Sequence, residues 1–452
     1  MRSDDVKRYL KHTRRERNID LHWKEILSGS GVSFVLKFAG MAFNYLFIFM
    51  ISRLYGADAF GAVSLTIVLL NIMALAGRFG IESVWLRFFA EYASVGRRDL
   101  IKGLYQKSLK LILPFSLMLS LMLYVFSGHL AQYVFHKVSL TAYFKIGALA
   151  VVPLVMVSLH SQAIRAMKRI ALYSFYQYIV HFFFACMFMG ILTLLMRNHL
   201  VPVLAYALAL SAGALLSYLS WKRVVAYENA PAIEQMTINA VMKIAIPMLI
   251  SSSLSLFLGW TDTLLLGIYR TEQEVGLYSV CLKIAMVVTF PLTAISSIVA
   301  PKFSESFARG DLNDLRSVIR RASMLNFWFS FPLFLAIVLL PGRLLGLFGS
   351  EFKEGLVPLL ILVVGQFINA LTGPVAFVLQ MTGREQFLRN VIVISTVINV
   401  VANILLIPRL GTTGAAIANM MSVAFWNLAA MFYIRRYLKV STLYVPLIQK
   451  IS

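Results

Sequence analysis

Apolar stretches of about twenty residues recur along this chain, and they constrain its fold more than any other feature. A helix that crosses the hydrocarbon core of a bilayer needs about 20 mostly apolar residues. Hydrophobic residues make up 59% of the 452 residues and charged residues 14%, whereas soluble domains contain about 45–50% and 25%. A soluble fold could not bury this much apolar surface. The composition therefore predicts an all-α membrane protein.

By this length criterion, the sequence predicts about twelve transmembrane helices. Prolines at 153, 291, 358 and 374 predict breaks in the fourth, eighth and tenth of them. Such breaks are tolerated where neighbouring helices satisfy the freed backbone groups. The expected spans are residues 32–54, 59–80, 104–127, 140–162, 172–196, 200–221, 240–268, 275–299, 320–341, 355–380, 387–407 and 413–435.

Basic residues gather in alternate loops and so predict the orientation of the chain. The net charge is +22, but its placement between apolar runs indicates cytoplasmic loops and argues against a nucleic-acid partner. The other set of loops carries about one basic residue each: Arg53, Lys137, Arg197, Arg270, Arg343 with Lys353, and Arg409. The positive-inside rule therefore places both termini of this multi-pass protein in the cytoplasm.

The two halves of the chain match each other at a constant offset. FGAVSL from Phe60 matches VGLYSV from Val275, and a basic segment follows each helix. We call the separation between Phe60 and Val275 the repeat offset. This duplication predicts two pseudo-symmetric six-helix bundles around a central cavity. The predicted divisions are a basic arm at 1–30, an N-terminal bundle at 31–222, a linker at 223–238, a C-terminal bundle at 239–438 and a tail at 439–452.

Polar side chains inside apolar helices are the candidates for function, because each costs several kcal/mol unless it faces a partner or a cavity. On the first helix, Ser33, Lys37, Gly40 and Asn44 share one face, although Lys37 could also snorkel to the interface. Basic side chains outnumber acidic ones at this depth, which favours an anionic cargo. The candidates for the translocation path are Lys37, Asn44, Asn71, Arg78 and Lys283.

Two acidic residues are candidates for coupling transport to a proton or sodium gradient. Glu82 lies four residues after Arg78, a spacing that also predicts an ion pair on one helix. Asp262 shares a face with Ser251 and Ser255, and Lys283 on the next helix is an alternative partner for it. Ser395, Asn399 and Asn403 on the eleventh helix predict hydrogen bonds between helices.

Catalytic and metal-binding motifs are lacking in the sequence. Neither a Walker GxxxxGK[ST] nor an HExxH motif occurs, and Cys186 and Cys281 each lie inside an apolar run. We therefore expect no catalytic residue, no metal site and no bound cofactor, and we expect a transport protein, not an enzyme.

Three segments resemble a known family of exporters. They are ISRLYGADAFGAVSL at 51–65 with RFGIESVWLRFFAEY at 78–92, DTLLLGIYRTEQEVGLYSVCLKI at 262–284, and MTGREQF at 381–387 leading to INVVANILLIPRLGTTGAAIANMMS at 398–422. In this order the chain resembles the Wzx-type polysaccharide and O-antigen flippases of the multidrug/oligosaccharidyl-lipid/polysaccharide exporter superfamily. The resemblance implies translocation of undecaprenyl-diphosphate-linked oligosaccharide across the bacterial inner membrane for surface polysaccharide biosynthesis. Lys37, Arg78 and Lys283 match that family's basic residues by type.

Two other functions compete with this expectation. A cation-coupled multidrug antiporter of the same superfamily should carry carboxylates deep in the first six helices, where only Glu82 qualifies. A membrane glycosyltransferase or polymerase should carry a large outer loop rich in acids or histidines, and the outer loops here are short. The expected partners are the lipid-linked oligosaccharide, membrane lipids and the polysaccharide polymerase machinery.

Overall fold

The computed structural model describes the backbone of residues 3–225 and 238–444. Side chains are described for the same residues apart from 3–30, 238, 247 and 250–258. Every regular element in these ranges is a helix, and no strand occurs among them. The all-α class predicted from composition is therefore confirmed.

Nine helices of the described chain are long and apolar enough to cross a membrane, or ten when a bent pair counts as one span. This confirms a multi-pass integral membrane protein. The nine are α1 (Ser3–Arg78), α3 (Arg98–His129) with η1 (Leu130–Val134), α6 (Ile170–Ser174) with η2 (Phe175–Ile179) and α7 (Val180–Leu195), α8 (Val201–Val224), α10 (Glu272–Met286) with η3 (Val287–Thr289) and α11 (Phe290–Ala308), α12 (Leu312–Leu339), η4 (Glu351–Gly355) with α14 (Leu356–Leu371) and α15 (Val375–Met381), α16 (Glu385–Leu410) and α17 (Thr412–Leu438); the pair is α4 (Leu140–Leu149) and α5 (Val151–Ala166).

The predicted total of twelve remains a prediction. The segment Gly31–Arg78 counts as one helix here, although the sequence predicts two spans within it. A further helix, α9 (Ile238–Tyr269), occupies the position of the predicted seventh span. Two shorter helices, α2 (Ile81–Ser94) and α13 (Pro341–Phe348), were not expected from the apolar pattern because neither is long enough to cross.

Gly56 reverses the direction of the chain inside α1. Its φ of 82° lies in the left-handed region, which glycine adopts without the steric cost that a Cβ brings. Before this turn Phe34 contacts Phe290, and after it Gly80 lies against Ala245. We refer to the two ends of the molecule as the Gly56 end and the Gly80 end; the predicted orientation makes the Gly80 end cytoplasmic.

The predicted breaks in the fourth, eighth and tenth spans are confirmed, except that Pro358 breaks no helix, because it lies in the first turn of α14, where its missing N–H has no helical partner. The fourth bends by 43° between α4 and α5, three residues before Pro153. The eighth passes through the 3-10 turn η3 just before Pro291, and the tenth breaks between α14 and α15, next to Pro374. Proline lacks the N–H that would bond to the preceding turn, so each break falls at or just before the ring.

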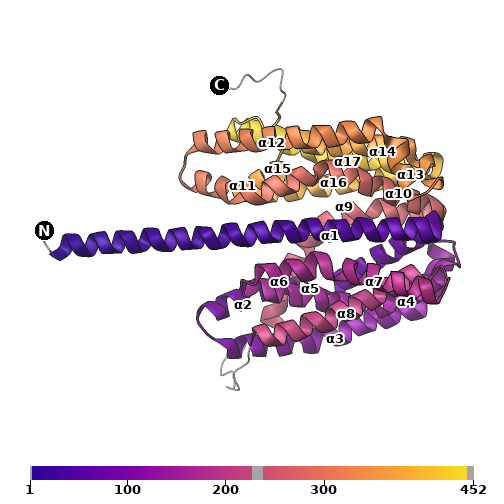
Figure 1. Ribbon diagram of the computed structural model, residues 1–452, viewed down its shortest axis with the longest axis horizontal. Coiled ribbons are helices and arrows are strands. Elements are labelled where there is room, and N and C mark those ends of the chain that lie inside the picture. Colours follow the sequence, from indigo (N-terminus) through magenta and orange to yellow (C-terminus); the bar gives the residue numbers. More distant parts are fainter. Residues whose placement is uncertain (1–2, 226–237, 445–452) are drawn as a thin grey trace.

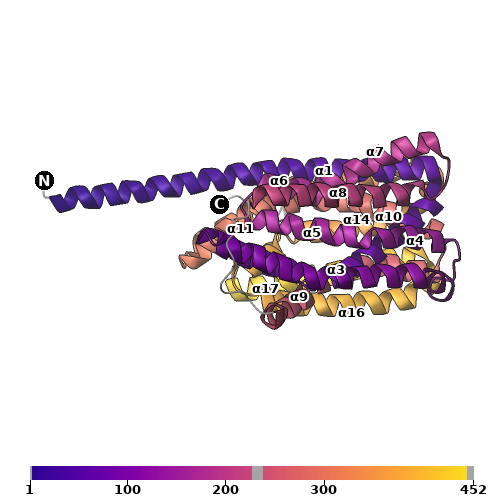
Figure 2. The same ribbon diagram turned by 90° about the horizontal axis from the view of Figure 1, so that it is seen from below.

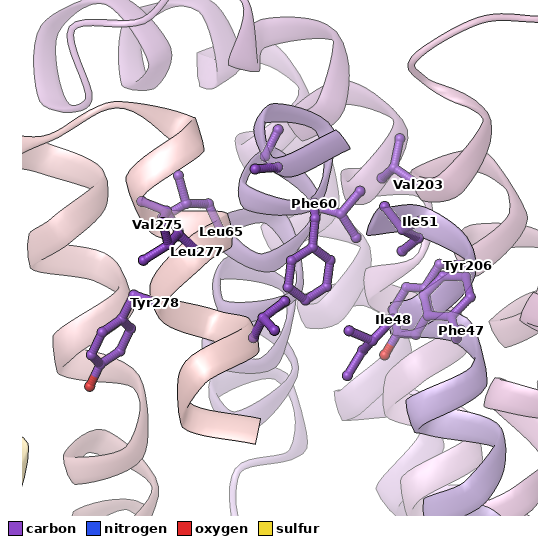
Figure 3. Packing of buried hydrophobic residues seen from close by; sticks show 14 of the residues in the cluster. Phe47, Ile48, Ile51, Phe60, Leu65, Val203, Tyr206, Val275, Leu277 and Tyr278 are labelled. Atoms are coloured by element: carbon purple, nitrogen blue, oxygen red, sulfur yellow. The ribbon is translucent and has the colours of Figure 1, made fainter. Parts of the chain in front are cut away.

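Two groups of helices flank α1 (Figure 1), and their cores show how they join. One buried cluster takes side chains from both halves, among them Phe47, Phe60, Val275 and Leu277 (Figure 3). Toward the Gly80 end the core divides: one cluster contains first-half side chains with Val241 and Ala245 of α9, and the other contains second-half side chains alone. The halves therefore share a core at the Gly56 end, whereas at the Gly80 end the second half, apart from the start of α9, has a core of its own.

A tight crossing between the halves joins two glycines that are related by the repeat offset. Gly61 follows Phe60 just as Gly276 follows Val275. A Cβ on Gly61 would overlap the carbonyl of Glu272, and a Cβ on Gly276 would overlap the carbonyl of Ala57. Ala57 and Glu272 each lie four residues before their glycine, so the contact is reciprocal. Such symmetry supports the duplication inferred from sequence.

The predicted domain divisions fall partly beyond the described residues. Most of the linker 223–238 and of the tail 439–452, and the side chains of the arm 1–30, lie outside them. The backbone of 3–30 is helical and continues directly into the first span.

Candidate functional site

Asp262 on α9 is a carboxylate at the centre of a polar cluster. Its side chain is fully buried and accepts hydrogen bonds from four groups. The Tyr278 hydroxyl and Asn419 Nδ2 donate to Oδ2 at 2.7 and 2.6 Å. Asn399 Nδ2 and Asn403 Nδ2 donate to Oδ1 at 2.9 and 2.7 Å. Four donors on one carboxylate stabilise its ionised form.

Four helices of the second half build this Asp262 cluster. Asn399 and Asn403 are four residues apart on α16 and so lie on one helical face. α9 lies beside α16 (Figure 2), while α10 supplies Tyr278 and α17 supplies Asn419. The predicted bonds between helices at Asn399 and Asn403 are therefore found, but they converge on the carboxyl group of Asp262.

Oxygen atoms remain available in the Asp262 cluster. The amide oxygens of Asn403 and Asn419 are buried and have no hydrogen-bond partner among the described residues. A buried amide oxygen without a donor costs about 1–3 kcal/mol. Rotating an asparagine amide exchanges the positions of its nitrogen and oxygen atoms. After such a rotation, these two side chains would present oxygen ligands beside Asp262 instead of N–H donors. The cluster can thus present several oxygen atoms to a hard monovalent cation.

Lys283 does not pair with Asp262, so that alternative from the sequence is wrong. Asp262 is satisfied by hydroxyl and amide donors, and the Lys283 ammonium takes part in none of the ion pairs of the described side chains. The Tyr45 hydroxyl donates to the Lys283 backbone carbonyl at 2.6 Å, which brings α1 against α10 beside this lysine. Ser251 and Ser255, predicted to share a face with Asp262, lie outside the described side chains.

Arg78 and Glu82 form the ion pair that their spacing predicts. Arg78 Nη1 lies 2.7 Å from Glu82 Oε2, and the side chains are 16% and 17% exposed. Arg78 Nε also donates to the Ala74 carbonyl at 3.1 Å. Asn71 on the same helix donates to the Ile67 carbonyl at 2.7 Å. Glu82 is therefore neutralised by a cation, whereas the described partners of Asp262 are all uncharged.

A double-mutant cycle with Arg78→Ala and Glu82→Ala measures the strength of this pair. We expect a coupling energy of about 0.5–1 kcal/mol, because water still reaches both side chains. Thermal unfolding of the purified protein in detergent gives the four stabilities. The exposed pair of Arg309 and Glu305 is the matched control and should give a value near zero. A coupling above about 3 kcal/mol would show a desolvated pair instead.

The polar face of the first helix packs against α6 and η2. Ser33 Oγ lies 2.8 Å from Ser174 Oγ, and a Cβ on Gly40 would overlap the Tyr178 carbonyl. The Lys37 ammonium lies over the Tyr178 ring, 5.4 Å from its centroid. Asn44, farther along, is half-buried. Lys37, Arg78 and Lys283 therefore lie in three different environments, and no described contact joins any two of them.

The Gly56 end is closed by contacts that cross between the halves. Ala57 N donates to Glu351 Oε1 at 2.8 Å, which places a carboxylate at the start of the helix that follows Gly56. In the reciprocal direction, Ser139 Oγ donates to Glu272 Oε1 at 2.5 Å. The repeat offset takes Ser139 to Glu354, which lies with Glu351 in η4. We call these contacts the outer clasp.

Lys137 adds a third contact to the outer clasp. Its ammonium donates to the Gly267 carbonyl at 2.6 Å. Burial lowers the pKa of Lys137, while Glu272 and Glu274 oppose that shift. The cationic form, which the hydrogen bond needs for its full strength, is thus supported by acids of the other half.

Several residues of the site were not found from the sequence. Tyr278, Asn419 and the clasp residue Glu351 had no candidate role. Polar spacing on α17 was the available signal, because Asn419 and Ser422 lie one turn apart, and Ser422 Oγ lies 3.3 Å from Asn399 Nδ2. Spacing within one helix cannot show which distant helix a side chain meets.

Comparison with known protein families gives two matches. The family described as polysaccharide biosynthesis protein matches residues 26–307, and the MatE family matches residues 247–405. Both confirm the expected membership of the multidrug/oligosaccharidyl-lipid/polysaccharide exporter superfamily, while the Wzx-type assignment stays a prediction.

Two curated relatives come from the archaeon Haloferax volcanii. The probable low-salt glycan biosynthesis flippase Agl15 is 25% identical over 196 residues, 43% of this chain and 42% of that protein. The probable flippase AglR is 28% identical over 177 residues, 38% of this chain and 37% of that protein. The chain thus spans about two fifths of the length of these relatives.

Solved structures share the fold at low sequence identity. The lipid II flippase MurJ in an inward closed conformation has a TM-score of 0.71 and 12% identity, covering 90% of this chain and 87% of that one. An inward-facing multidrug resistance MATE family transporter has a TM-score of 0.68 and 15% identity, covering 91% and 98%. Since the match over residues 26–307 takes in more than half of the sequence, the chain belongs to the family described as polysaccharide biosynthesis proteins.

Proposed function

We propose that this protein is a flippase that moves lipid-linked oligosaccharide between the leaflets of the cytoplasmic membrane. The cargo is an undecaprenyl-diphosphate-linked unit destined for O-antigen, capsule or exopolysaccharide. The names of the Haloferax volcanii relatives support a glycan flippase. Membrane lipids and the polysaccharide polymerase machinery are the proposed partners, and the orientation has both termini in the cytoplasm.

The charge composition of the first half is the observation that most supports an anionic cargo. From Leu100 to Tyr227 the sequence contains eleven lysines and arginines and no aspartate or glutamate. α4 to α8 are built entirely from this stretch, and α3 is built from it apart from its first two residues. Most of these basic residues lie in loops or at helix ends, so this stretch offers a cationic ligand no acid to bind, and its overall positive charge attracts an anionic one. A diphosphate is attracted to it, and a cationic drug is repelled.

Lys37, Asn44, Asn71, Arg78 and Lys283 are the proposed translocation residues, and Lys283 is the strongest of them. Its ammonium forms no ion pair among the described side chains. A cation at membrane depth costs several kcal/mol without a partner. A passing diphosphate would supply that partner during the transport cycle.

The Asp262 cluster is the proposed coupling site. A monovalent cation entering beside Asp262 would rotate the Asn403 and Asn419 amides, whose oxygens lack a partner among the described residues, into ligand positions. Oxygen ligands suit hard cations. Protonation of Asp262 is the alternative, and it would instead weaken the four hydrogen bonds that favour the ionised form. Glu82 is the weaker coupling candidate, because Arg78 already neutralises it.

A cation-coupled multidrug antiporter is the second candidate, because the MatE family matches residues 247–405. Such an antiporter needs an acidic group to hold a cationic drug. The absence of acids from Leu100 to Tyr227 argues against such a group in that part of the chain.

Reconstitution of the full chain into vesicles tests the proposal. A fluorescent oligosaccharide on a polyprenyl diphosphate is placed in both leaflets, and a membrane-impermeant quencher is added outside. We expect quenching to pass from about one half to near completion only with protein present. Quenching that stops at one half, together with export of a cationic dye by the same vesicles, would contradict the flippase and support the antiporter.

A further inference from the structure

A cluster of two cations and two tyrosines lies beside α1 toward the Gly80 end. The Lys37 ammonium lies 5.4 Å from the centre of the Tyr178 ring. The Arg165 guanidinium lies 5.2 Å from the centre of the Tyr173 ring. The two rings meet edge to face, with 6.3 Å between their centres. The four residues form one continuous group, the Lys37–Arg165 cluster.

The elements that carry this cluster supply no carboxylate to neutralise it. They are α1 from residue 31 to the turn at Gly56, α5, α6 and η2, and they contain no aspartate or glutamate; neither does the adjoining α7. Arg165 is close enough to Lys37 to repel it. Its one described side-chain acceptor is Gln162 Oε1, at 3.5 Å. Two cations held near each other without an acid create a site of high positive potential.

The backbone fixes this geometry. η2 is a π-helical turn over Phe175–Ile179, and such turns insert one extra residue into a helix, often at functional sites. Tyr178 lies in this turn, and its carbonyl packs directly against Gly40 of α1. Freely snorkelling side chains would reach separately into water. Here Lys37 and Arg165 instead lie over two rings that contact each other.

We propose that the Lys37–Arg165 cluster binds the phosphate or diphosphate headgroup of a lipid before that lipid enters the translocation path. The planar Arg165 guanidinium can donate two parallel hydrogen bonds to phosphate oxygens, and Lys37 adds a point charge. Arg165 is exposed and Lys37 is half-buried, so each side chain is accessible from outside the protein core. This inference rests on the proposed flippase function and adds a loading site at the predicted cytoplasmic end.

Binding by the purified full chain in nanodiscs of phosphatidylcholine tests the loading site without requiring transport. The probe is geranylgeranyl diphosphate, with geranylgeraniol as the uncharged comparison. We expect Lys37→Gln and Arg165→Gln each to weaken binding of the diphosphate about ten-fold or more, with binding of the alcohol unchanged. Lys145→Gln is the matched control, because Lys145 lies over the Tyr124 ring at 5.7 Å. It should bind the diphosphate as the wild type does.

Two further measurements distinguish a lipid diphosphate from a free anion and from bulk anionic lipid. Inorganic pyrophosphate that competes fully with the lipid at equal concentration would overturn a lipid site and indicate a free anion. Nanodiscs of phosphatidylglycerol that abolish binding would assign the cluster to bulk anionic lipid and also overturn the proposal. Equal losses in all three lysine and arginine variants would show a general charge effect and would likewise overturn it. Vesicles that flip no lipid would contradict the proposed function, whereas the binding result would still decide the site.

Discussion

Replacing Asp262 with asparagine is expected to abolish transport and its dependence on a coupling cation while leaving the protein folded. Asparagine has nearly the same shape, but it carries no charge and accepts fewer hydrogen bonds. Four donors bond to Asp262, and the single amide oxygen of asparagine could not accept from all of them. We expect the free energy of unfolding to fall by about 1–2 kcal/mol. Asp262→Leu removes the acceptor entirely and should destabilise the protein by about 3–5 kcal/mol or more.

Thermal unfolding at increasing sodium or potassium concentration separates folding from coupling. A ligand that binds only the folded state stabilises it by about 2.7 kcal/mol at one hundred times its Kd. We therefore expect the melting temperature of the wild type to rise with the coupling cation, and that of Asp262→Asn to stay constant. Glu82→Gln is the comparison, because Glu82 was the other coupling candidate. If Glu82→Gln, and not Asp262→Asn, removed the cation dependence, the coupling site would lie at the Arg78 pair.

The helices could be predicted from the sequence because the bilayer imposes a length and a polarity on each of them. Pro153, Pro291 and Pro374 revealed the broken spans, since a missing N–H acts within its own turn. Arg78 and Glu82 revealed their ion pair for a similar reason, because residues four apart face each other on any helix. Features that depend on one helix alone were therefore accessible.

The Asp262 cluster could not be predicted because it depends on how four helices are aligned. Tyr278 and Asn419 lie 16 and 157 residues from Asp262 in sequence. A rotation of one helix by a single residue turns its side chains by about 100°, which would exchange Asn399 for an apolar neighbour. Lys283 was the plausible partner by charge, yet the alignment of α10 gives Tyr278 that position instead. The π-helical turn at Phe175–Ile179 likewise could not be predicted, because no residue type is characteristic of such a turn.

The internal repeat in the sequence relates contacts that the structure places between the two halves. The repeat offset relates Gly61 to Gly276, and these glycines meet at a tight crossing between the halves. The same offset relates the loop of Ser139 to that of Glu351, and the two loops form the reciprocal contacts of the outer clasp. The contacts that close the Gly56 end are therefore symmetric, because each half contacts the turn of the other half.

Replacing Gly61 or Gly276 with alanine is expected to destabilise the closed Gly56 end, although alanine ordinarily favours a helix by about 1 kcal/mol over glycine. Each new Cβ would overlap a backbone carbonyl of the facing helix, and a backbone atom cannot move aside as a side chain can. Overpacking of this kind costs about 1–3 kcal/mol or more. This cost should exceed the gain in helix propensity, so the net effect should be a loss of stability. The two variants should behave alike because the contact is reciprocal.

Gly190→Ala on α7 is the matched control, because a Cβ there meets no described atom within 4 Å. It should raise the melting temperature slightly and leave transport unchanged. Gly61→Ala and Gly276→Ala should lower the melting temperature and raise the rate at which a membrane-impermeant maleimide labels a cysteine placed at Ser139, since the halves can no longer approach. Transport should fall at least ten-fold, because a cycle between two open ends needs each end to close in turn. An increase in stability with normal transport would show that the helices do not cross this closely at Gly61 and Gly276.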